Sequence, residues 1–173
     1  ISSAASDVYK RQVNDMAEKQ PNTRFEESGG GLYKIKGGIG HSDWSADGMQ
    51  PHLADKMLEY LDENKDSDKP FFLYMALTAP HIPLFPSKEF KGKSKIGDYG
   101  DLVMMIDDIV GRVNRKLKEI GKYDNTIVMF AADNGCAGYI NMDRINRKGH
   151  YPSYIYRGYK SHGWEGGHRI PFI

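Results

Sequence analysis

An aspartate and an asparagine stand together at the end of an apolar run in this sequence. The run Thr126–Ala132 is rich in β-branched and other apolar residues, and Asp133-Asn134-Gly135 follows it directly. Such a run is typical of a buried strand of a parallel sheet, and open α/β sheets bind ligands at the carboxyl ends of their strands. A carboxylate beside an amide supplies hard oxygen donors that suit Ca²⁺ or Mg²⁺. The same tripeptide is also a common turn sequence, so a plain loop is the competing interpretation.

Two further segments carry residues that could do chemistry near this pair. A second apolar run, Phe71–Leu77, continues into Thr78-Ala79-Pro80-His81. If both runs are strands, His81 and Asp133 lie at the same edge of the sheet. A basic, glycine-rich segment follows downstream, with the sequences Arg157-Gly158-Tyr159-Lys160 and Trp164-Glu165-Gly166-Gly167. Taken alone, His81 is better explained as a loop histidine held between prolines for turn geometry.

This order of motifs resembles the type I sulfatases, the arylsulfatase-like branch of the alkaline phosphatase superfamily. The shared signature is a strand ending in Ala-Pro-His, a helix, a strand ending in Asp-Asn-Gly, and then Lys-x-x-x-Trp-Glu-Gly-Gly; it covers the chain from about Pro51 to Ile173. The resemblance implies an α/β fold in which helices flank a mixed, mainly parallel sheet. It also implies hydrolysis of a sulfate ester to an alcohol and inorganic sulfate, with a hydrated formylglycine as nucleophile.

The resemblance assigns roles to four residues of this chain. Asp133 and Asn134 match two oxygen ligands of a Ca²⁺ ion that would polarise a sulfate oxygen; the family's other ligands, an aspartate pair, are absent from this sequence. His81 is expected to contact the sulfate and to protonate the leaving group. Lys160 is expected to offset the negative charge that shifts as the sulfur–oxygen bond breaks. A solvated surface lysine is the competing interpretation of Lys160.

The remaining parts of the signature are expected to be structural. Trp164, Glu165 and the glycine pair after them should support the loop that carries Lys160, because glycine permits close backbone approach. The family's nucleophile is a cysteine in a Cys-x-Pro-Ser-Arg context, whereas Cys136 is followed by Ala-Gly-Tyr. Cys136 is therefore predicted to be a packed or loop thiol, and formylglycine is expected in a longer parent protein, outside this chain.

Several other polar groups have interpretations that the sequence leaves open. Asp107 and Asp108 point about 100° apart on a helix, so exposed or capping positions are favoured over a paired-carboxylate site. Three histidines could shape substrate specificity or be solvated; they are His150, His162 and His168. A basic loop could grip a sulfated glycan, although a solvated face is favoured; its members are Lys88, Lys91, Lys93 and Lys95.

The spacing of apolar residues predicts the helices that would position these strands. Gln50–Asn64 and Gly100–Ile120 carry apolar residues at helical intervals, and Gly121 suits the C-cap of the second helix. The strand–helix–strand order implies a right-handed crossover and parallel strands. The polar, glycine-rich segment Val13–Asp47 is expected to form loops, with a short hairpin around Leu32–Ile39.

Composition is that of a globular protein, with 39% apolar and 27% charged residues. A net charge of +1 gives no global field that would select nucleic acid, and no apolar run approaches the length of a membrane span. The expected partner is therefore a sulfated small molecule or glycan. A location in the periplasm or outside the cell is expected from the family resemblance alone.

We expect the sequence to be an incomplete piece of its parent. Ser2–Gln12 back-translates to a widely used transposase sequencing adapter, so residues 1–12 are expected to be a sequencing artefact. Residues 13–173 are then expected to be the C-terminal part of a sulfatase catalytic domain, interrupted within a strand at Ile173. Such a piece holds part of the site and is expected to be inactive alone.

Two other functions compete with a sulfatase. A phosphodiesterase or phosphonate hydrolase of the same superfamily would meet similar tetrahedral oxygens, and Asp-Asn-Gly cannot separate it from a sulfatase, although Lys-x-x-x-Trp-Glu-Gly-Gly favours the sulfatase. A catalytically dead glycan-binding homologue is the alternative from a different class. The residue at the nucleophile position of the parent protein would separate these three functions.

Overall fold

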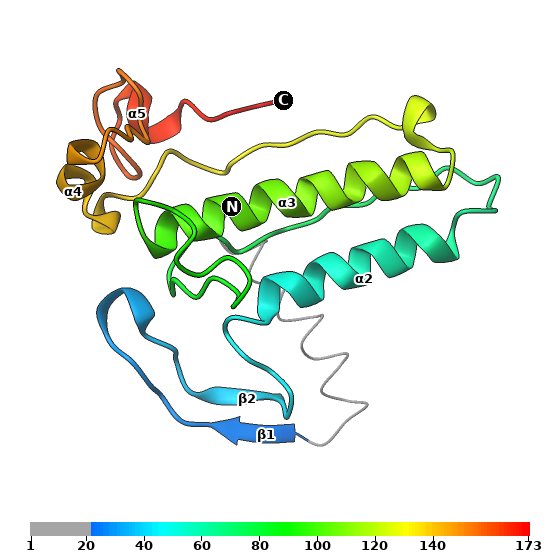
Figure 1. Ribbon diagram of the computed structural model, residues 1–173, viewed down its shortest axis with the longest axis horizontal. Helices are drawn as coiled ribbons and strands as arrows, with labels where there is room; N and C mark the ends of the chain where they lie inside the picture. The colour runs from blue at the N-terminus through cyan, green and yellow to red at the C-terminus, as the bar shows by residue number, and fades with distance from the viewer. Residues whose placement is uncertain (1–21) are drawn as a thin grey trace.

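The computed structural model describes residues 22–173 (Figure 1). The expectation about Ser2–Gln12 lies outside these residues. Along the chain the structure has β1 (Asn22–Phe25), η1 (Gly31–Tyr33), β2 (Gly38–His41), α2 (Met49–Glu63), α3 (Asp98–Glu119), η2 (Tyr123–Asn125), η3 (Gly138–Ile140), α4 (Met142–Arg147) and α5 (Glu165–His168). No helix in residues 22–173 is both long enough and apolar enough to cross a membrane.

The two long helices form where the apolar spacing predicts them. α2 agrees with the predicted Gln50–Asn64, and α3 starts slightly before the predicted Gly100. α3 carries acidic residues in its first turn and lysines in its last, an arrangement that complements the helix dipole. Gly121 has φ 69° and its N–H donates to the carbonyl of Lys118, so it ends the helix as predicted.

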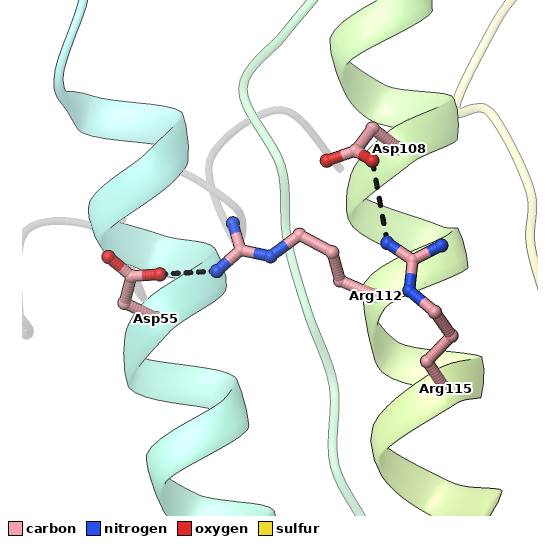
Figure 2. A network of polar contacts seen from close by, with 4 residues as sticks. All are labelled: Asp55, Asp108, Arg112 and Arg115. Carbon is pink, nitrogen blue, oxygen red and sulfur yellow. Dashed lines mark hydrogen bonds and ion pairs between the residues drawn. The ribbon is translucent and has the colours of Figure 1, made fainter.

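The buried core lies between α2, α3 and the loop that precedes α3. Its buried cluster consists of Ala54, Met57, Leu84, Phe90, Leu102, Met105 and Ile109. An ion pair of 2.6 Å between Arg112 and Asp55 joins the two helices at their surface (Figure 2). Asp108 pairs with Arg115 of the same helix at 3.5 Å. Asp107 is exposed, so the two neighbouring aspartates of α3 form no paired-carboxylate site, in agreement with the sequence.

One buried carboxylate anchors the loop before α3. Asp101 is fully buried and accepts hydrogen bonds from the N–H groups of Gly92 (2.7 Å) and Ser94 (2.6 Å). Backbone donors thus satisfy a group that would otherwise be costly to bury. The lysines at positions 88, 91, 93 and 95 in this loop are all exposed, which fits the solvated face favoured by the sequence.

The N-terminal part of the described chain is a hairpin. β1 and β2 pair antiparallel, with Asn22 opposite His41 and Phe25 opposite Gly38. The hairpin is therefore wider than the predicted Leu32–Ile39: that segment contains only the start of β2, while β1 lies entirely before it.

The predicted strands Phe71–Leu77 and Thr126–Ala132 are extended but do not pair with each other, which corrects the expected parallel ladder. Among the described residues the regular sheet is β1–β2, and Ala131 makes an isolated antiparallel bridge to Phe172. A strand is defined by its hydrogen bonds to neighbouring strands. An extended segment that is apolar on both faces is stable only when other elements pack against both faces. Residues 22–173 cover these runs on one face only, since Phe72 is 85% exposed and Ile127 87% exposed.

The direction of the two extended segments agrees with the sequence. Both run from the end of the molecule where α2 and α3 finish towards the end where α4 and α5 lie (Figure 1). His81 and Asp133, which follow these segments, are therefore delivered to the same end of the molecule. His81 and Asp133 thus lie at the same end of the molecule, as predicted, although the two segments before them do not form the predicted parallel strands.

Candidate functional site

One cavity brings together residues from the two ends of the motif series. Its volume is about 340 Å³, and it is lined by His81, Ala137, Gly138, Tyr139, Tyr159, Lys160 and Ser161. His81 follows the first extended segment, and Lys160 belongs to the loop before α5. The predicted imidazole and ammonium groups therefore share one site. A cavity of this size is suited to a small molecule.

The imidazole of His81 is oriented by its own backbone surroundings. Nδ1 lies 2.8 Å from the carbonyl oxygen of Ile82. A carbonyl can only accept, so this hydrogen bond places a proton on Nδ1 and leaves Nε2 as the ring nitrogen for other contacts. In this arrangement Nε2 accepts a proton when the ring is neutral and donates one when the ring is protonated. The Tyr139 ring packs edge-on against the imidazole, with centroids 5.9 Å apart.

Backbone hydrogen bonds tie the loop that carries Lys160 to the Asp-Asn-Gly turn. The N–H of Lys160 donates to the carbonyl of Cys136 at 2.8 Å, and the N–H of Gly135 donates to the carbonyl of Gly167 at 2.9 Å. Within the loop, the N–H of Gly166 donates to the carbonyl of Arg157 at 2.9 Å. The position of the ammonium group therefore depends on main-chain contacts between two motifs that lie far apart in the sequence.

Glycines are required where these backbones cross. A Cβ on Gly135 would lie 1.9 Å from the carbonyl oxygen of Gly166, and a Cβ on Gly166 would lie 2.2 Å from that of Gly158. A Cβ on Gly167 would lie 2.1 Å from the carbonyl oxygen of His162. No side chain fits at such distances, so the glycine pair serves close backbone approach, as the sequence predicts.

Comparison with known proteins decides the family. The family model described as Sulfatase matches residues 6–173.

The chain belongs to the sulfatase family.

The chain is similar to several sulfatases, to some over most of its length and to others over less than half. An N-acetylgalactosamine-6-O-sulfatase of Bacteroides thetaiotaomicron is 33% identical over 95% of this chain and 35% of its own length. The human N-acetylgalactosamine-6-sulfatase is 48% identical over 39% of this chain and 13% of its own length. The chain thus spans about a third or less of the length of these curated relatives.

Solved structures confirm the α/β fold class of this sulfatase chain. A structure described under the metabolism of multiple glycosaminoglycans by Bacteroides thetaiotaomicron superposes with a TM-score of 0.71 at 28% identity, over 93% of this chain and 35% of that one. A sulfatase from Pseudoalteromonas sp. superposes with a TM-score of 0.61 at 30% identity, over 73% of this chain and 24% of that one. Both sequence identities exceed 25%, so the similarity to these two structures includes the sequence as well as the fold.

The two predicted metal ligands of the sulfatase chain lie beside the cavity and are not among its lining residues. The side chain of Asn134 donates its Nδ2 to the carbonyl of Gly135 at 3.0 Å, which leaves its oxygen as a free acceptor. Asp133 is exposed. In residues 22–173 no three His, Cys, Asp or Glu side chains gather closely enough to hold a metal ion. The pair fits a hard cation by its chemistry and would supply part of the six to eight oxygens that Ca²⁺ takes.

Tyr139 and Tyr159 line the cavity and were missed by the sequence analysis. Burial raises the pKa of Tyr139; a backbone hydrogen bond with Ile82 opposes this shift and the charge of Asp133 adds to it. Tyr139 is therefore a neutral phenol at neutral pH, and the negative charge of Asp133 favours this neutral form. A tyrosine a few residues after Asp-Asn-Gly carries no sequence signal of its own in a chain rich in tyrosine.

Cys136 is a packed thiol, as the sequence predicts. Its Sγ lies 3.3 Å from the Ser153 hydroxyl and 3.6 Å from the Met142 sulfur. Burial raises the pKa of the thiol, and the contact with Ser153 opposes this shift. Because the thiolate is the reactive form of cysteine, this environment suits an unreactive, structural thiol.

The three histidines that the sequence left open lie outside the lining of the cavity. His162 packs against Tyr159 with ring centroids 4.1 Å apart, and His168 faces Glu165 at 3.7 Å. His150 is exposed. Of the three, His162 alone touches a lining residue, so it is the one placed to support the cavity.

Aromatic and charged side chains brace the loop around the glycine pair. The guanidinium of Arg157 lies 3.9 Å from the centroid of the Trp164 ring. Glu165 pairs with Arg169 at 3.2 Å. Both contacts are partly exposed and individually modest. Together with the backbone bonds above, they fit the predicted structural role of Trp164 and Glu165.

Proposed function

We propose that this chain is part of a sulfatase catalytic domain whose substrate is the sulfate ester of a sugar or a small glycan. The observation that carries the proposal is the shared cavity of His81 and Lys160, with the loop carrying Lys160 tied to the Asp-Asn-Gly turn. The names of the relatives support the substrate class, because two of them act on N-acetylgalactosamine 6-sulfate groups by name. The reaction is hydrolysis to an alcohol and inorganic sulfate.

Lys160 and His81 act at opposite ends of the sulfur–oxygen bond that breaks. Lys160 places a compact positive charge with three donors beside the sulfate oxygens, where negative charge shifts as the sulfur–oxygen bond breaks. His81, with Nδ1 held by Ile82, delivers a proton from Nε2 to the departing alkoxide oxygen. The formylglycine of the family, located outside this chain, supplies the nucleophile when present.

We further propose that Asp133 and Asn134 hold a Ca²⁺ ion together with ligands outside this chain. Their oxygens are hard donors, and the free acceptor of Asn134 is compatible with coordination. The ion would supply Lewis-acid stabilisation of a sulfate oxygen. The chain itself contributes the orientation of Asn134, through its bond to Gly135, and a carboxylate charge beside the cavity.

The function is tested on the complete protein that carries this chain. Purified protein is incubated with N-acetylgalactosamine 6-sulfate, with an aryl sulfate and with an aryl phosphodiester, and released sulfate, phenol and phosphate are measured. A sulfatase releases sulfate from the esters and leaves the phosphodiester largely intact. Preferential turnover of the phosphodiester would favour the phosphodiesterase, and binding of sulfated sugar without any turnover would favour the inactive glycan-binding homologue.

Replacing Asp133 by alanine in the complete protein is expected to remove the bound Ca²⁺. One hard, charged ligand is lost, and the ligands that remain would hold Ca²⁺ more weakly. Metal content after dialysis is the readout, since it does not depend on turnover. Asp124→Ala is the control, because Asp124 is an exposed aspartate of η2 without a proposed ligand role. Equal calcium content in both variants would remove Asp133 from the metal site.

Replacing His81 by alanine is expected to affect substrates according to their leaving groups. A sugar alkoxide leaves poorly without a proton, whereas an activated phenolate needs none, so kcat/KM should fall by about 10²-fold more for sugar sulfates than for activated aryl sulfates. Kinetics on both substrate types are compared with those of His52→Ala, which changes an exposed histidine of α2. An equal loss on both substrate types would reduce the role of His81 to sulfate binding.

A further inference from the structure

Two tyrosine rings flank the proposed sulfate-handling groups in the cavity. Tyr139 lies beside His81, and Tyr159 directly precedes Lys160; all four residues line the same space. Tyr139 is 39% exposed and Tyr159 is 38% exposed, so each leaves part of its surface open. The roles derived above for His81 and Lys160 do not use either ring.

Tyr139 is held in place at two points. Its ring packs edge-on against His81 at 5.9 Å with an interplanar angle of 75°, and its hydroxyl makes a backbone hydrogen bond with Ile82. The same residue, Ile82, accepts from Nδ1 of His81. Tyr139 and His81 therefore share one anchor, and the ring has a fixed position relative to the imidazole.

Tyr159 is about as exposed as Tyr139, but its ring is packed against its neighbours on two sides. The ring of His162 lies 4.1 Å away at a tilt of 37°. On Gly138 a Cβ would lie 2.3 Å from the Tyr159 ring, so the backbone of residue 138 is in direct contact with it. Of the two rings, Tyr139 is thus the better candidate for a contact surface.

The position of Tyr139 beside His81 decides which part of a substrate it would meet. The oxygen that His81 protonates is bonded to the carbon of the leaving alcohol, so that alcohol extends away from the sulfate on the side of His81. Lys160 stays with the sulfate oxygens. A ring next to His81 is therefore placed to meet the organic group and not the anion.

We propose that Tyr139 is a substrate-specificity residue: its ring stacks against the sugar ring that carries the sulfate ester. This inference rests on the proposed function. The face of an aromatic ring carries partial negative charge, and one face of a pyranose presents C–H groups of opposite polarity. The hydroxyl of Ser161 also lines the cavity and is suited to the polar rim of a sugar. The volume of about 340 Å³ is near the lower end for ligand sites, which suits a single sugar unit.

Three variants of the complete protein test the proposal. Tyr139→Leu removes the ring, Tyr139→Phe keeps it, and Tyr123→Leu changes a comparably exposed tyrosine of η2 (37%). KM and kcat are measured with N-acetylgalactosamine 6-sulfate, and inorganic sulfate is used as a competitive inhibitor. Sulfate reports on the anion contacts alone, so it separates stacking on the sugar from damage to the whole site.

The expected result is a KM for the sugar sulfate raised about tenfold in Tyr139→Leu, the size of a lost aromatic contact. Tyr139→Phe loses the hydroxyl contact with Ile82 but keeps the ring packing on His81, so its KM should rise clearly less than that of Tyr139→Leu. Tyr123→Leu should stay within about twofold of the parent protein, and the inhibition constant of sulfate should be unchanged in every variant. An unchanged KM in Tyr139→Leu, an equal loss in Tyr139→Phe, or a parallel loss of sulfate inhibition would overturn the proposal.

Failure of the proposed function gives a different pattern. If the complete protein hydrolyses no sulfate ester, the affinity for the intact sugar sulfate is measured directly by calorimetry on the same variants. A tenfold weaker affinity in Tyr139→Leu alone would then support the stacking contact in a protein that is not a sulfatase. Equal affinities across the variants would refute the stacking contact.

Discussion

Replacing Lys160 by alanine in the complete protein is expected to lower kcat/KM by about 10²–10³ for every sulfate ester, comparable to the loss of one oxyanion donor. We propose that the ammonium group acts on the sulfate, which all substrates share, so the loss should not depend on the organic group. Lys160 lines the same cavity as His81, so its charge lies close to the proposed leaving-group acid.

Two comparisons sharpen this prediction. Lys88→Ala changes an exposed lysine of the loop before α3 and should leave the kinetics unchanged. Lys160→Arg keeps the charge but exchanges a compact point charge for a planar fork, so it should restore part of the activity. A loss in Lys160→Ala that appears with sugar sulfates and not with aryl sulfates would show that Lys160 contacts the organic group instead.

The parts of the site that sequence could predict are those encoded by local patterns. Helical spacing places α2 and α3, and the direction of the two apolar runs brings His81 and Asp133 to one end of the molecule. The close backbone approach at Gly166 and Gly167 is also foreseeable in kind, because a glycine has no Cβ to prevent it.

The parts that could not be predicted depend on neighbours distant in sequence. Whether Phe71–Leu77 forms a ladder depends on neighbouring strands and not on its own composition alone; among the described residues it belongs to no sheet. Tyr139 lines the cavity because it packs on His81, and the spacing of residues in the sequence does not predict this contact. Asp101 resembled an ordinary acidic residue in the first turn of a helix, yet it is buried and anchors a loop.

Replacing Gly166 by alanine is expected to be nearly as damaging as removing the Lys160 side chain itself. The new Cβ would lie 2.2 Å from the carbonyl oxygen of Gly158 and 2.8 Å from that of Arg157, so the loop must shift. Both acceptors belong to the segment that leads into Lys160. A displacement of about 1 Å at a catalytic group can cost about 10²-fold in rate, and we expect kcat/KM to fall by at least about that much.

A glycine of the same loop provides the matched control for Gly166→Ala. Gly163 is exposed, and a Cβ there would meet nothing within 4 Å, so Gly163→Ala should retain the activity of the parent protein. The double variant Lys160→Ala/Gly166→Ala separates positioning from general damage. If the glycine acts by placing Lys160, the double variant should be no slower than Lys160→Ala, because residues that act as a unit are not additive. The alternative result is a double variant whose loss in kcat/KM equals the product of the two single losses, together with a lowered melting temperature in Gly166→Ala. It would show that the backbone contact at Gly166 supports the fold as a whole and not the position of the ammonium group.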